Sequence, residues 1–504
     1  MRTLLLCCII LVSAPKTFAQ PCKEVVGYYP SWQWYDRDKL VNPHSIDYSK
    51  YTILNYAFLK PEPDGSISLF DSWADENLLL GEIDWSSGGY VPNTSLISKA
   101  HTNNVKVLPS IGGWTLSDNF PGIAADPQKR QTFAQACVDL IQTYNFDGID
   151  LDWEYPGFVD HNGTPQDFQN FTLLLQEVRT AIDNYGASIG KTMLLTAAVG
   201  ASQQHMDNVD WNAVSPLLDI INLMSYDFFG TWDPITNHNA PLFAPQQGGA
   251  DFNVSSAIDL LINNYNVPKE KITAGVAFYG RSAKTSGTPT LHGASTGLAD
   301  NVTFSIDAGT PLYYSVLIEQ NQFDDHWDDI AKVPYMTGKN GLNTFLSYDN
   351  ELSIELKAQH IVEKDIRGAI IWEITGDYIE TAPGSGVIAH TPLVNKLNDV
   401  FCNYVPSGGS GGNGGSGNVG LNEEQTDFVS LYPNPASTIL TISTGSSDKV
   451  QVEIIDGHGK IVSAHTLNNT SESIDISHLT AGVYQVQMSF SSRKVVRKKL
   501  VKLE

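Results

Sequence analysis

One stretch of the chain, residues 146–156, reads FDGIDLDWEYP and holds four carboxylates within eight positions. Asp150, Asp152 and Glu154 have the same parity, so in an extended strand their side chains leave one face, about 6.6 Å apart in successive pairs. Carboxylates this close cannot all ionise freely, and one or more must keep a proton where an isolated acid would lose it. The stretch therefore predicts a strand that carries a general acid. Asp147 has the opposite parity, and we expect it to be structural.

Short apolar runs of this kind recur along the chain. The eight candidate strands are residues 25–29, 53–58, 105–111, 149–154, 193–199, 220–226, 272–278 and 369–372. Several are followed by segments of helical period, such as the one that Asp126 and Pro127 begin. Strands alternating with helices predict the α/β class and a closed (β/α)8 TIM barrel. A doubly wound open sheet is the alternative, but it would need a glycine-rich turn after the first strand, where the chain has Pro30-Ser31-Trp32.

In such a barrel Glu154 would lie at the carboxyl end of its strand, where active sites of these barrels open. A purely structural acidic strand is the alternative, but three acids pointing into a barrel are costly to bury without a function. A calcium loop is disfavoured because Tyr155 stands where such a loop requires glycine. The twelve histidines show no H-E-x-x-H spacing, so we expect neither a metal nor a cofactor.

The chain is predicted to have several parts. Residues 1–19 are typical of a secretory signal, with Arg2, an apolar run and a small-x-small cleavage site. Residues 20–404 form the catalytic domain, in which the wide spacing between the seventh and eighth runs predicts an α+β insertion at about 282–345, with β-like pieces at residues 302–306, 311–314 and 344–347. Residues 405–422 form a flexible Gly/Ser linker, and the alternating short runs of residues 423–504 predict a β-sandwich.

Charge and cysteine content limit the partners and the compartment. The formal net charge is −24, which disfavours nucleic acid and anionic membrane surfaces as partners. The signal at residues 1–19 predicts export, and no later stretch is long and apolar enough for a membrane span, so we expect a secreted, extracellular protein. We expect it to be a monomer. Cys137 lies on an amphipathic segment and is expected to be a buried thiol. Cys22 and Cys402 could form a disulfide joining the two ends of one domain, a pairing that the sequence leaves open.

The D-x-x-D-x-D-x-E pattern of the acidic strand resembles that of glycoside hydrolase family 18, the chitinase family. Further motifs in the family's strand order spread across residues 24–377, among them SIGGW at 110–114, MSYD at 224–227 and YGR at 279–281. The resemblance implies the barrel fold, and the insertion is similar to the α+β domain that walls the groove in one subfamily. It also implies a chitin or chito-oligosaccharide substrate.

The resemblance further implies roles for four catalytic residues. Glu154 would protonate the leaving glycosidic oxygen, and the substrate's own 2-acetamido carbonyl would attack to form an oxazolinium ion, with retention of configuration. Asp152 would turn between Asp150 and Glu154 and hold the acetamido N–H, while Tyr226 would donate its hydroxyl to the acetamido group. Sugar faces stack on aromatic rings, and the implied substrate-binding residues are Tyr28, Trp32, Phe58, Trp114, Tyr155, Met224, Asp227, Trp232, Arg281 and Trp372.

The tail has two interpretations. A glycine-rich linker often precedes a carbohydrate-binding module, but LYPNPA at residues 431–436 and RKKLVK at 497–502 resemble the C-terminal sorting domain of type IX secretion substrates. The second interpretation predicts that the protein binds the type IX secretion machinery. It also implies attachment to the cell surface as one destination. Two alternatives to chitinase activity stay open: an endo-β-N-acetylglucosaminidase acting on N-glycan cores, and a lectin that binds chitin without cleaving it.

Overall fold

A computed structural model of the protein describes residues 22–406, 429–432, 436–444, 449–456, 460–469, 471–490 and 495–503. The predicted signal at 1–19 and nearly all of the predicted linker at 405–422 lie outside these ranges. The contacts between Cα atoms divide the chain into two units, with the division at residue 409.

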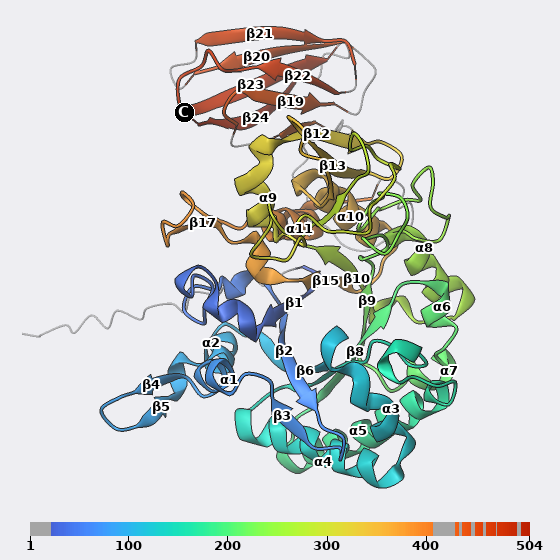
Figure 1. The fold of residues 1–504 in the computed structure, drawn as a ribbon. Coiled ribbons are helices and arrows are strands. Elements are labelled where there is room, and N and C mark those ends of the chain that lie inside the picture. Colours follow the sequence, from blue (N-terminus) through green and yellow to red (C-terminus); the bar gives the residue numbers. More distant parts are fainter. Residues whose placement is uncertain are drawn as a thin grey trace, which may run out of the picture. The chain divides into compact units, whose positions relative to one another are not determined.

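The first unit is built on eight parallel strands that close into a barrel (Figure 1). In barrel order they are β1 (Glu24–Pro30), β2 (Ile53–Pro61), β6 (Lys106–Gly112), β7 (Gly148–Asp152), β8 (Leu194–Gly200), β9 (Ile220–Met224), β10 (Ile272–Ala277) and β15 (Gly368–Trp372). Pairing of β1 with both β2 and β15 closes the ring. All eight strands match the runs in the sequence, so the barrel prediction is confirmed. Glu154, expected at the end of its strand, lies two residues beyond β7.

Each barrel strand is buried on both faces, which explains why its sequence is a continuous apolar run. In β1, Val26 and Tyr28 pack inside the barrel, whereas Val25 and Tyr29 pack against the surrounding helices. Because both faces of each strand are covered, neither parity can be polar without a special reason.

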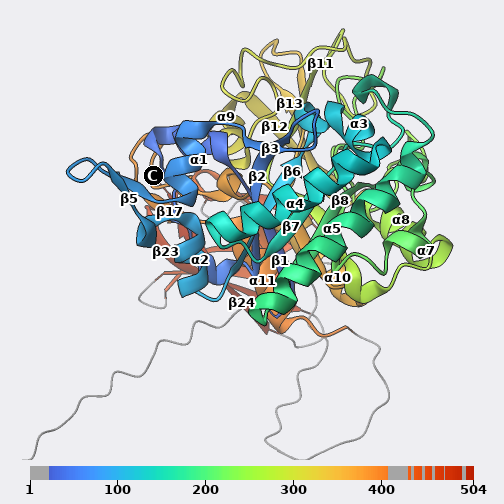
Figure 2. The ribbon, with the colours of Figure 1, turned by 90° about the horizontal axis from the view of Figure 1, so that it is seen from below.

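Helices surround the barrel (Figure 2). Those of the first unit are α1 (Ser72–Leu79), α2 (Leu96–Thr102), α3 (Phe120–Ala125), α4 (Pro127–Tyr144), α5 (Asp167–Ile189), α6 (Gln203–Met206), α7 (Trp211–Val214), α8 (Val254–Asp259), α9 (Tyr313–Glu319), α10 (Glu351–Glu363) and α11 (Pro392–Asn403). Helix α4 begins where the sequence indicates, because the Asp126 carboxylate caps the backbone N–H groups of Gln128 and Lys129. Cys137 lies buried on its inner face as a free thiol, and burial raises its pKa.

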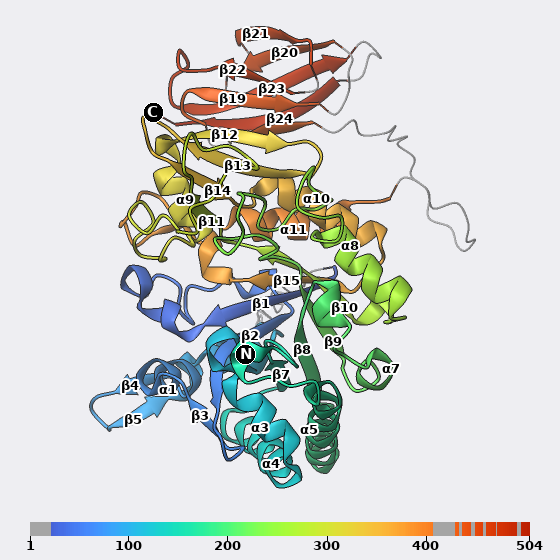
Figure 3. The same cartoon turned by 45° about the vertical axis from the view of Figure 1, so that its right-hand side comes forward.

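Short strands decorate the barrel. Strand β3 (Ile67–Leu69) pairs antiparallel with β2, and a hairpin of β4 (Glu82–Asp84) and β5 (Gly89–Val91) projects beside α1 (Figure 3). Strands β16 (Ile379–Glu380) and β17 (Ile388–His390) form another small pair. A disulfide between Cys22 and Cys402, with Cα atoms 5.1 Å apart, joins the two ends of this unit, so the pairing left open by the sequence is formed.

The insertion after β10 is an antiparallel sheet with one helix. Its strands, in order across the sheet, are β11 (Arg281–Lys284), β14 (Thr344–Ser347), β13 (Val333–Gly338) and β12 (Phe323–Asp328), with α9 beside them. The prediction for residues 344–347 is confirmed. The β-like piece predicted at 302–306 is wrong, because Asp300 accepts hydrogen bonds from the N–H groups of Val302 and Thr303 and holds this segment in turns. Residues 311–314 form one isolated bridge and then enter α9.

The described residues of the tail hold seven strands in two antiparallel sheets. One sheet has β18 (Ser430–Tyr432), β19 (Ile439–Ser443) and β22 (Ser471–Asp475); the other has β21 (Ile461–Leu467), β20 (Val450–Ile455), β23 (Gly482–Phe490) and β24 (Val495–Lys502). Leu440 and Ile474 of the first sheet share one core with Val452, Val486 and Leu500 of the second. This packing of two sheets is the strand-rich tail that the sequence predicts.

Candidate active site

Asp150 lies fully buried at the centre of the barrel, where side chains from four other strands donate hydrogen bonds to it. Tyr28 Oη and Ser110 Oγ each lie 2.7 Å from Oδ2, Asn222 Nδ2 lies 3.1 Å from Oδ1, and Thr196 Oγ1 also donates to Oδ1. Burial raises the pKa of the Asp150 carboxyl, and these hydrogen bonds oppose the increase.

Three of these donors were not among the predicted site residues. Ser110 and Thr196 are the direct register partners of Asp150 on the neighbouring strands, and Asn222 comes from the strand beyond. In the sequence, each of these residues is a polar residue within an otherwise apolar run, at a position whose side chain points into the barrel. This pattern identifies a polar position on each strand, but only the register shows which of these positions meet. Asp147, expected to be structural, accepts hydrogen bonds from Val107 N–H and lies 2.8 Å from His101 Nε2.

Asp152 points to the same side as Asp150 and is 3% exposed. Its Oδ1 has no hydrogen-bond partner within the described residues. Burial, the Glu154 charge and the Asp150 charge, in that order, raise the pKa of the Asp152 carboxyl well above its usual range. A buried carboxyl with an unpaired oxygen and a raised pKa can hold a proton or accept a hydrogen bond from a bound group.

Glu154 is held by the loop after β6. Its backbone N–H donates to Ser117 Oγ at 2.9 Å, and Nδ1 of His161 lies 2.6 Å from its carbonyl oxygen. Burial and the nearby Asp227 charge raise the pKa of the Glu154 carboxyl to about 7, although hydrogen bonds from the Tyr155 hydroxyl and the Trp114 N–H lower it. A carboxyl of this pKa is partly protonated near neutral pH, as a general acid requires.

Two glycines explain the path of the chain beside the acids. Gly112 has φ +112°, and a Cβ there would lie 2.2 Å from the Asp152 carbonyl oxygen. Gly113 has φ +84° and donates its N–H to that oxygen at 2.8 Å. Only glycine fits both the close approach and the left-handed backbone. The two glycines therefore fix the turn that brings Trp114 to the edge of the site.

Tyr226 and Asp227 come from the end of β9. Burial and the nearby Asp152 charge raise the pKa of the Tyr226 hydroxyl well above its usual range, so it stays a hydrogen-bond donor. Asp227 accepts hydrogen bonds from Tyr279 Oη and Arg281 Nε. The Arg281 guanidinium lies 4.7 Å from the centre of the Trp232 ring, which is 58% exposed. These side chains form a polar cluster near the acids.

Predicted aromatic residues gather around the acids. The ring of Trp372 lies 5.6 Å from Phe58 in a stacked arrangement, 5.5 Å from Tyr28 and 6.4 Å from Trp32. Trp32 is 39% exposed, so this cluster has an open edge. Met224 is buried beside Tyr226 in the barrel core that these rings continue.

Aromatic side chains also lie on the other side of the acids. Trp114 is 51% exposed, with its ring 4.6 Å from that of His161. Tyr155 stacks on His205 at 3.9 Å, and burial lowers the pKa of His205. His161 and His205 were not predicted as site residues, because no motif or spacing distinguishes them from the other histidines.

The structure thus brings the predicted acids, Tyr226, Asp227, Arg281 and the aromatic residues to one end of the barrel. Among the residues that the structure describes, no group of three or more His, Cys, Asp or Glu side chains could hold a metal ion. A TIM barrel with carboxyls of raised pKa at its carboxyl end, beside open aromatic rings, has the architecture of a glycoside hydrolase.

Comparison with known proteins gives the family. Residues 24–377 match the profile of glycosyl hydrolases family 18, and residues 430–502 match that of the secretion system C-terminal sorting domain. The chain belongs to glycosyl hydrolases family 18 and is a hydrolase. Its sorting domain marks it as a secreted protein, and no helix in the described ranges is long and apolar enough to cross a bilayer.

Similar proteins include Chitinase A1 of Niallia circulans, which is 34% identical over 403 residues, covering 71% of this chain and 57% of that protein. The chain therefore spans little more than half the length of that relative. Chitinase 1 of Aphanocladium album is 32% identical over 358 residues, covering 69% of this chain and 80% of that protein. The solved structure of the Ostrinia furnacalis Group IV chitinase is similar with a TM-score of 0.64 and 31% identity, and covers 75% of this chain and 100% of that one.

Proposed function

We propose that the protein is a secreted chitinase that hydrolyses β-1,4-linked N-acetylglucosamine chains with retention of configuration. The observation that carries this proposal is the Glu154 carboxyl, whose pKa of about 7 suits a general acid near neutral pH. Relatives named chitinases support the choice of substrate.

In the proposed reaction Glu154 gives its proton to the glycosidic oxygen. The sugar whose C1 carries this oxygen supplies the nucleophile. Its acetamido carbonyl oxygen attacks C1 as the C1–O bond breaks, which forms an oxazolinium ion and releases the rest of the chain. Water then attacks C1 from the leaving-group side, and the Glu154 carboxylate takes its proton. The product sugar keeps the β configuration because C1 is inverted twice.

Asp152 and Tyr226 hold the attacking group in this proposal. The Asp152 carboxyl, with an unpaired buried oxygen, accepts the acetamido N–H and offsets the positive charge of the oxazolinium ion. The Tyr226 hydroxyl, kept protonated by burial and nearby carboxylates, donates to the acetamido oxygen. Asp150, held by four donors, is the fixed negative neighbour toward which Asp152 turns before the substrate binds.

We also propose roles for the substrate-binding residues and the boundaries of the chain's parts. Trp372 and its aromatic neighbours form the floor under the cleaved sugar, and Trp32, Trp114 and Trp232 offer open rings on which further sugars stack. Residues 1–19 are the signal, 20–404 the catalytic domain, 405–422 the linker and 423–504 the type IX sorting domain. Normal secretion of a chain lacking residues 423–504 would contradict the last assignment.

The mechanism is tested by Glu154→Gln, which keeps the shape of the side chain but removes the proton. We expect chito-oligosaccharide binding to remain and turnover to fall at least a thousandfold. Asp147→Asn is the matched control, because it changes an acid of the same sequence motif that lies outside the site. NMR of fresh product should show the β-anomer first. An initial α-anomer, or near-normal activity of Glu154→Gln, would contradict the mechanism.

The substrate is tested by product profiling on chitin, chito-oligosaccharides and a high-mannose glycoprotein. We expect release of short N-acetylglucosamine oligomers from the first two. Release of intact N-glycans in their place would favour the endo-β-N-acetylglucosaminidase alternative. Chitin binding without any product would favour the lectin alternative.

A further inference from the structure

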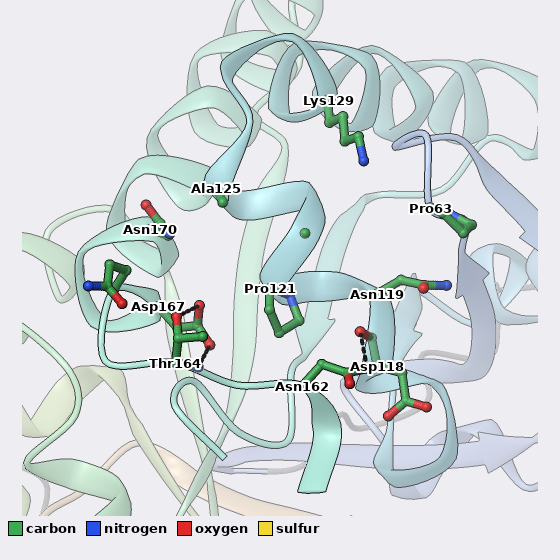
Figure 4. Close-up of a pocket in the computed structure, with 12 residues that line it drawn as sticks. Pro63, Asp118, Asn119, Pro121, Ala125, Lys129, Asn162, Thr164, Asp167 and Asn170 are labelled. Carbon is green, nitrogen blue, oxygen red and sulfur yellow. Dashed lines mark hydrogen bonds between the residues drawn. The ribbon is translucent and has the colours of Figure 1, made fainter. Parts of the chain in front are cut away.

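A separate pocket, drawn in Figure 4, lies among the loops that follow β2, β6 and β7, at the end of the barrel where the acids lie. It has a volume of about 530 Å³, and its lining residues come from the loops and helix starts that follow β2, β6 and β7. Ligands of TIM barrels bind at this carboxyl end of the strands. Glu154 does not line the pocket, so this is a second hollow on the functional face of the barrel.

Four amide side chains line the pocket, those of Asn119, Asn162, Gln166 and Asn170. Asn119, Asn162 and Asn170 lie on different sides of Pro121 (Figure 4). The Asn119 amide nitrogen donates to the Pro61 carbonyl at 3.0 Å and that of Asn162 to the Asp118 carbonyl at 3.3 Å, which leaves both amide oxygens as acceptors. The Asn170 side chain has no hydrogen-bond partner among the described residues, so it can both donate and accept.

The floor between the amides is apolar. Pro121 and Ala125 of α3 line it, and Gly122 lies between them. A Cβ at Gly122 would meet no atom within 4 Å, so the pocket is open directly above this residue. An apolar floor flanked by amide groups matches a pyranose ring, which has C–H groups on its faces and polar groups at its edge.

The charged side chains at the pocket disfavour polyanions and single ions as ligands. Asp118 and Lys129 line it with opposite signs, which disfavours a polyanion. The Asp167 carboxylate accepts hydrogen bonds from Gly157 N–H and from the N–H and hydroxyl of Thr164. These bonds hold the loop before α5, so the carboxylate is not free to bind an ion. A neutral ligand with amide and hydroxyl groups fits best.

We propose that this pocket is a second saccharide site, which binds an N-acetylglucosamine unit of the substrate polymer outside the catalytic groove. The assignment rests on the proposed chitinase function for the identity of the sugar. Amide groups of the pocket pair with the acetamido group, and the proline and alanine floor contacts the ring. Binding there holds the polymer on the barrel between cleavage events.

The test counts chitobiose molecules bound per chain by equilibrium dialysis in the full-length Glu154→Gln protein. We expect Gly122→Leu to remove one bound chitobiose per chain, because the new side chain fills the pocket without a clash. Gly287→Leu is the matched control, since a Cβ at Gly287 would also meet no atom within 4 Å and this residue lies outside the pocket. That variant should bind as many molecules as the Glu154→Gln protein. Asn170→Ala, which adds no bulk, should weaken the second site about tenfold.

Each result has one meaning. An unchanged number of bound molecules in Gly122→Leu, or the same loss in Gly287→Leu, would overturn the second site. Displacement of chitobiose from the second site by an equal concentration of cellobiose, which lacks acetamido groups, would overturn the role of the amides. Hydrolysis of chitotetraose by the unmodified protein tests the proposed function separately. Hydrolysis together with an unchanged number of molecules bound to Gly122→Leu refutes the pocket only, whereas absence of hydrolysis refutes the proposed function.

Discussion

Burial is the main cause of the raised pKa of Glu154, and the charge of Asp227 adds to it. Asp227 raises the pKa of Glu154, and Asp227→Asn removes this charge and leaves the Arg281 guanidinium without its carboxylate. Both changes favour the ionised form of Glu154, so its pKa must fall. A neighbouring charge of this kind is worth about one pH unit or more, or about 1.4 kcal/mol.

The expected change in activity follows from the protonated fraction of Glu154. With a pKa of about 7, about half of the chains carry the proton at pH 7. With a pKa about one unit lower, about 9% carry it at pH 7, whereas about 90% still carry it at pH 5. The variant should therefore lose about fivefold more activity at pH 7 than at pH 5, whatever its absolute rate.

The assay is kcat/KM on a soluble chito-oligosaccharide across the pH range, because this ratio reports the ionisation of the free enzyme. Asp160→Asn is the control, since it removes an equal charge at an exposed position in the loop after β7. It should leave the alkaline limb of the profile in place. An alkaline limb of Asp227→Asn that stays in place, or moves to higher pH, would refute the assignment of Glu154 as the acid tuned by Asp227.

Other predictions concern the hydroxyl at the site and the stability of the barrel. Tyr226→Phe should lower kcat about 10²- to 10³-fold with KM changed only a few fold, since the hydroxyl acts on the attacking group; a KM increase equal to the kcat loss would contradict this. Lys357→Met should lower the free energy of unfolding by about 3–5 kcal/mol in urea titrations, because Lys357 Nζ lies 2.6 and 2.7 Å from the two oxygens of the buried Asp349 carboxylate. A double variant with Asp349→Ala should lose less, and equal losses would argue against an unpaired charge as the cause. Cys22→Ser should lower the free energy of unfolding by about 2–5 kcal/mol, because it opens a disulfide with a sequence separation of 380. Reduction of the unmodified protein should have the same effect, and an unchanged denaturation midpoint would contradict the prediction.

The sequence predicts the barrel well because each strand is buried on both faces. In the run of residues 220–226, for example, Ile220, Ile221 and Leu223 are apolar and occupy both parities, which leaves a strong local pattern. Strand β12 shows why the insertion was predicted less well. It reads FDDHWD, with three acids and three exposed side chains, so its pairing with β13 leaves no apolar alternation to detect. The exposed Val302 and Ile306 caused the opposite error, a strand predicted where the chain forms turns, because β-branched residues are typical of strands.

The acidic strand of the site could be predicted because its spacing is local. Asp150, Asp152 and Glu154 follow one another at every second position, so parity alone gives their common face. The hydrogen bonds from Thr196 and Asn222 to Asp150 could not be predicted, because they depend on the register between strands far apart in the sequence.

The disulfide between Cys22 and Cys402 also determines how the catalytic unit bears mechanical load. Cys22 precedes β1 at the amino end of the barrel strands, and Cys402 lies in the last turn of α11, just before the chain leaves this unit. A pull on the chain beyond residue 406 therefore passes through a covalent bond to the start of β1 and does not peel α11 from the barrel. Because β1 is hydrogen-bonded to β2 and β15 along its length, the force is spread over two strands in shear. The groove, at the opposite end of the strands, can keep its shape while the enzyme is tethered to one body and its polymer to another.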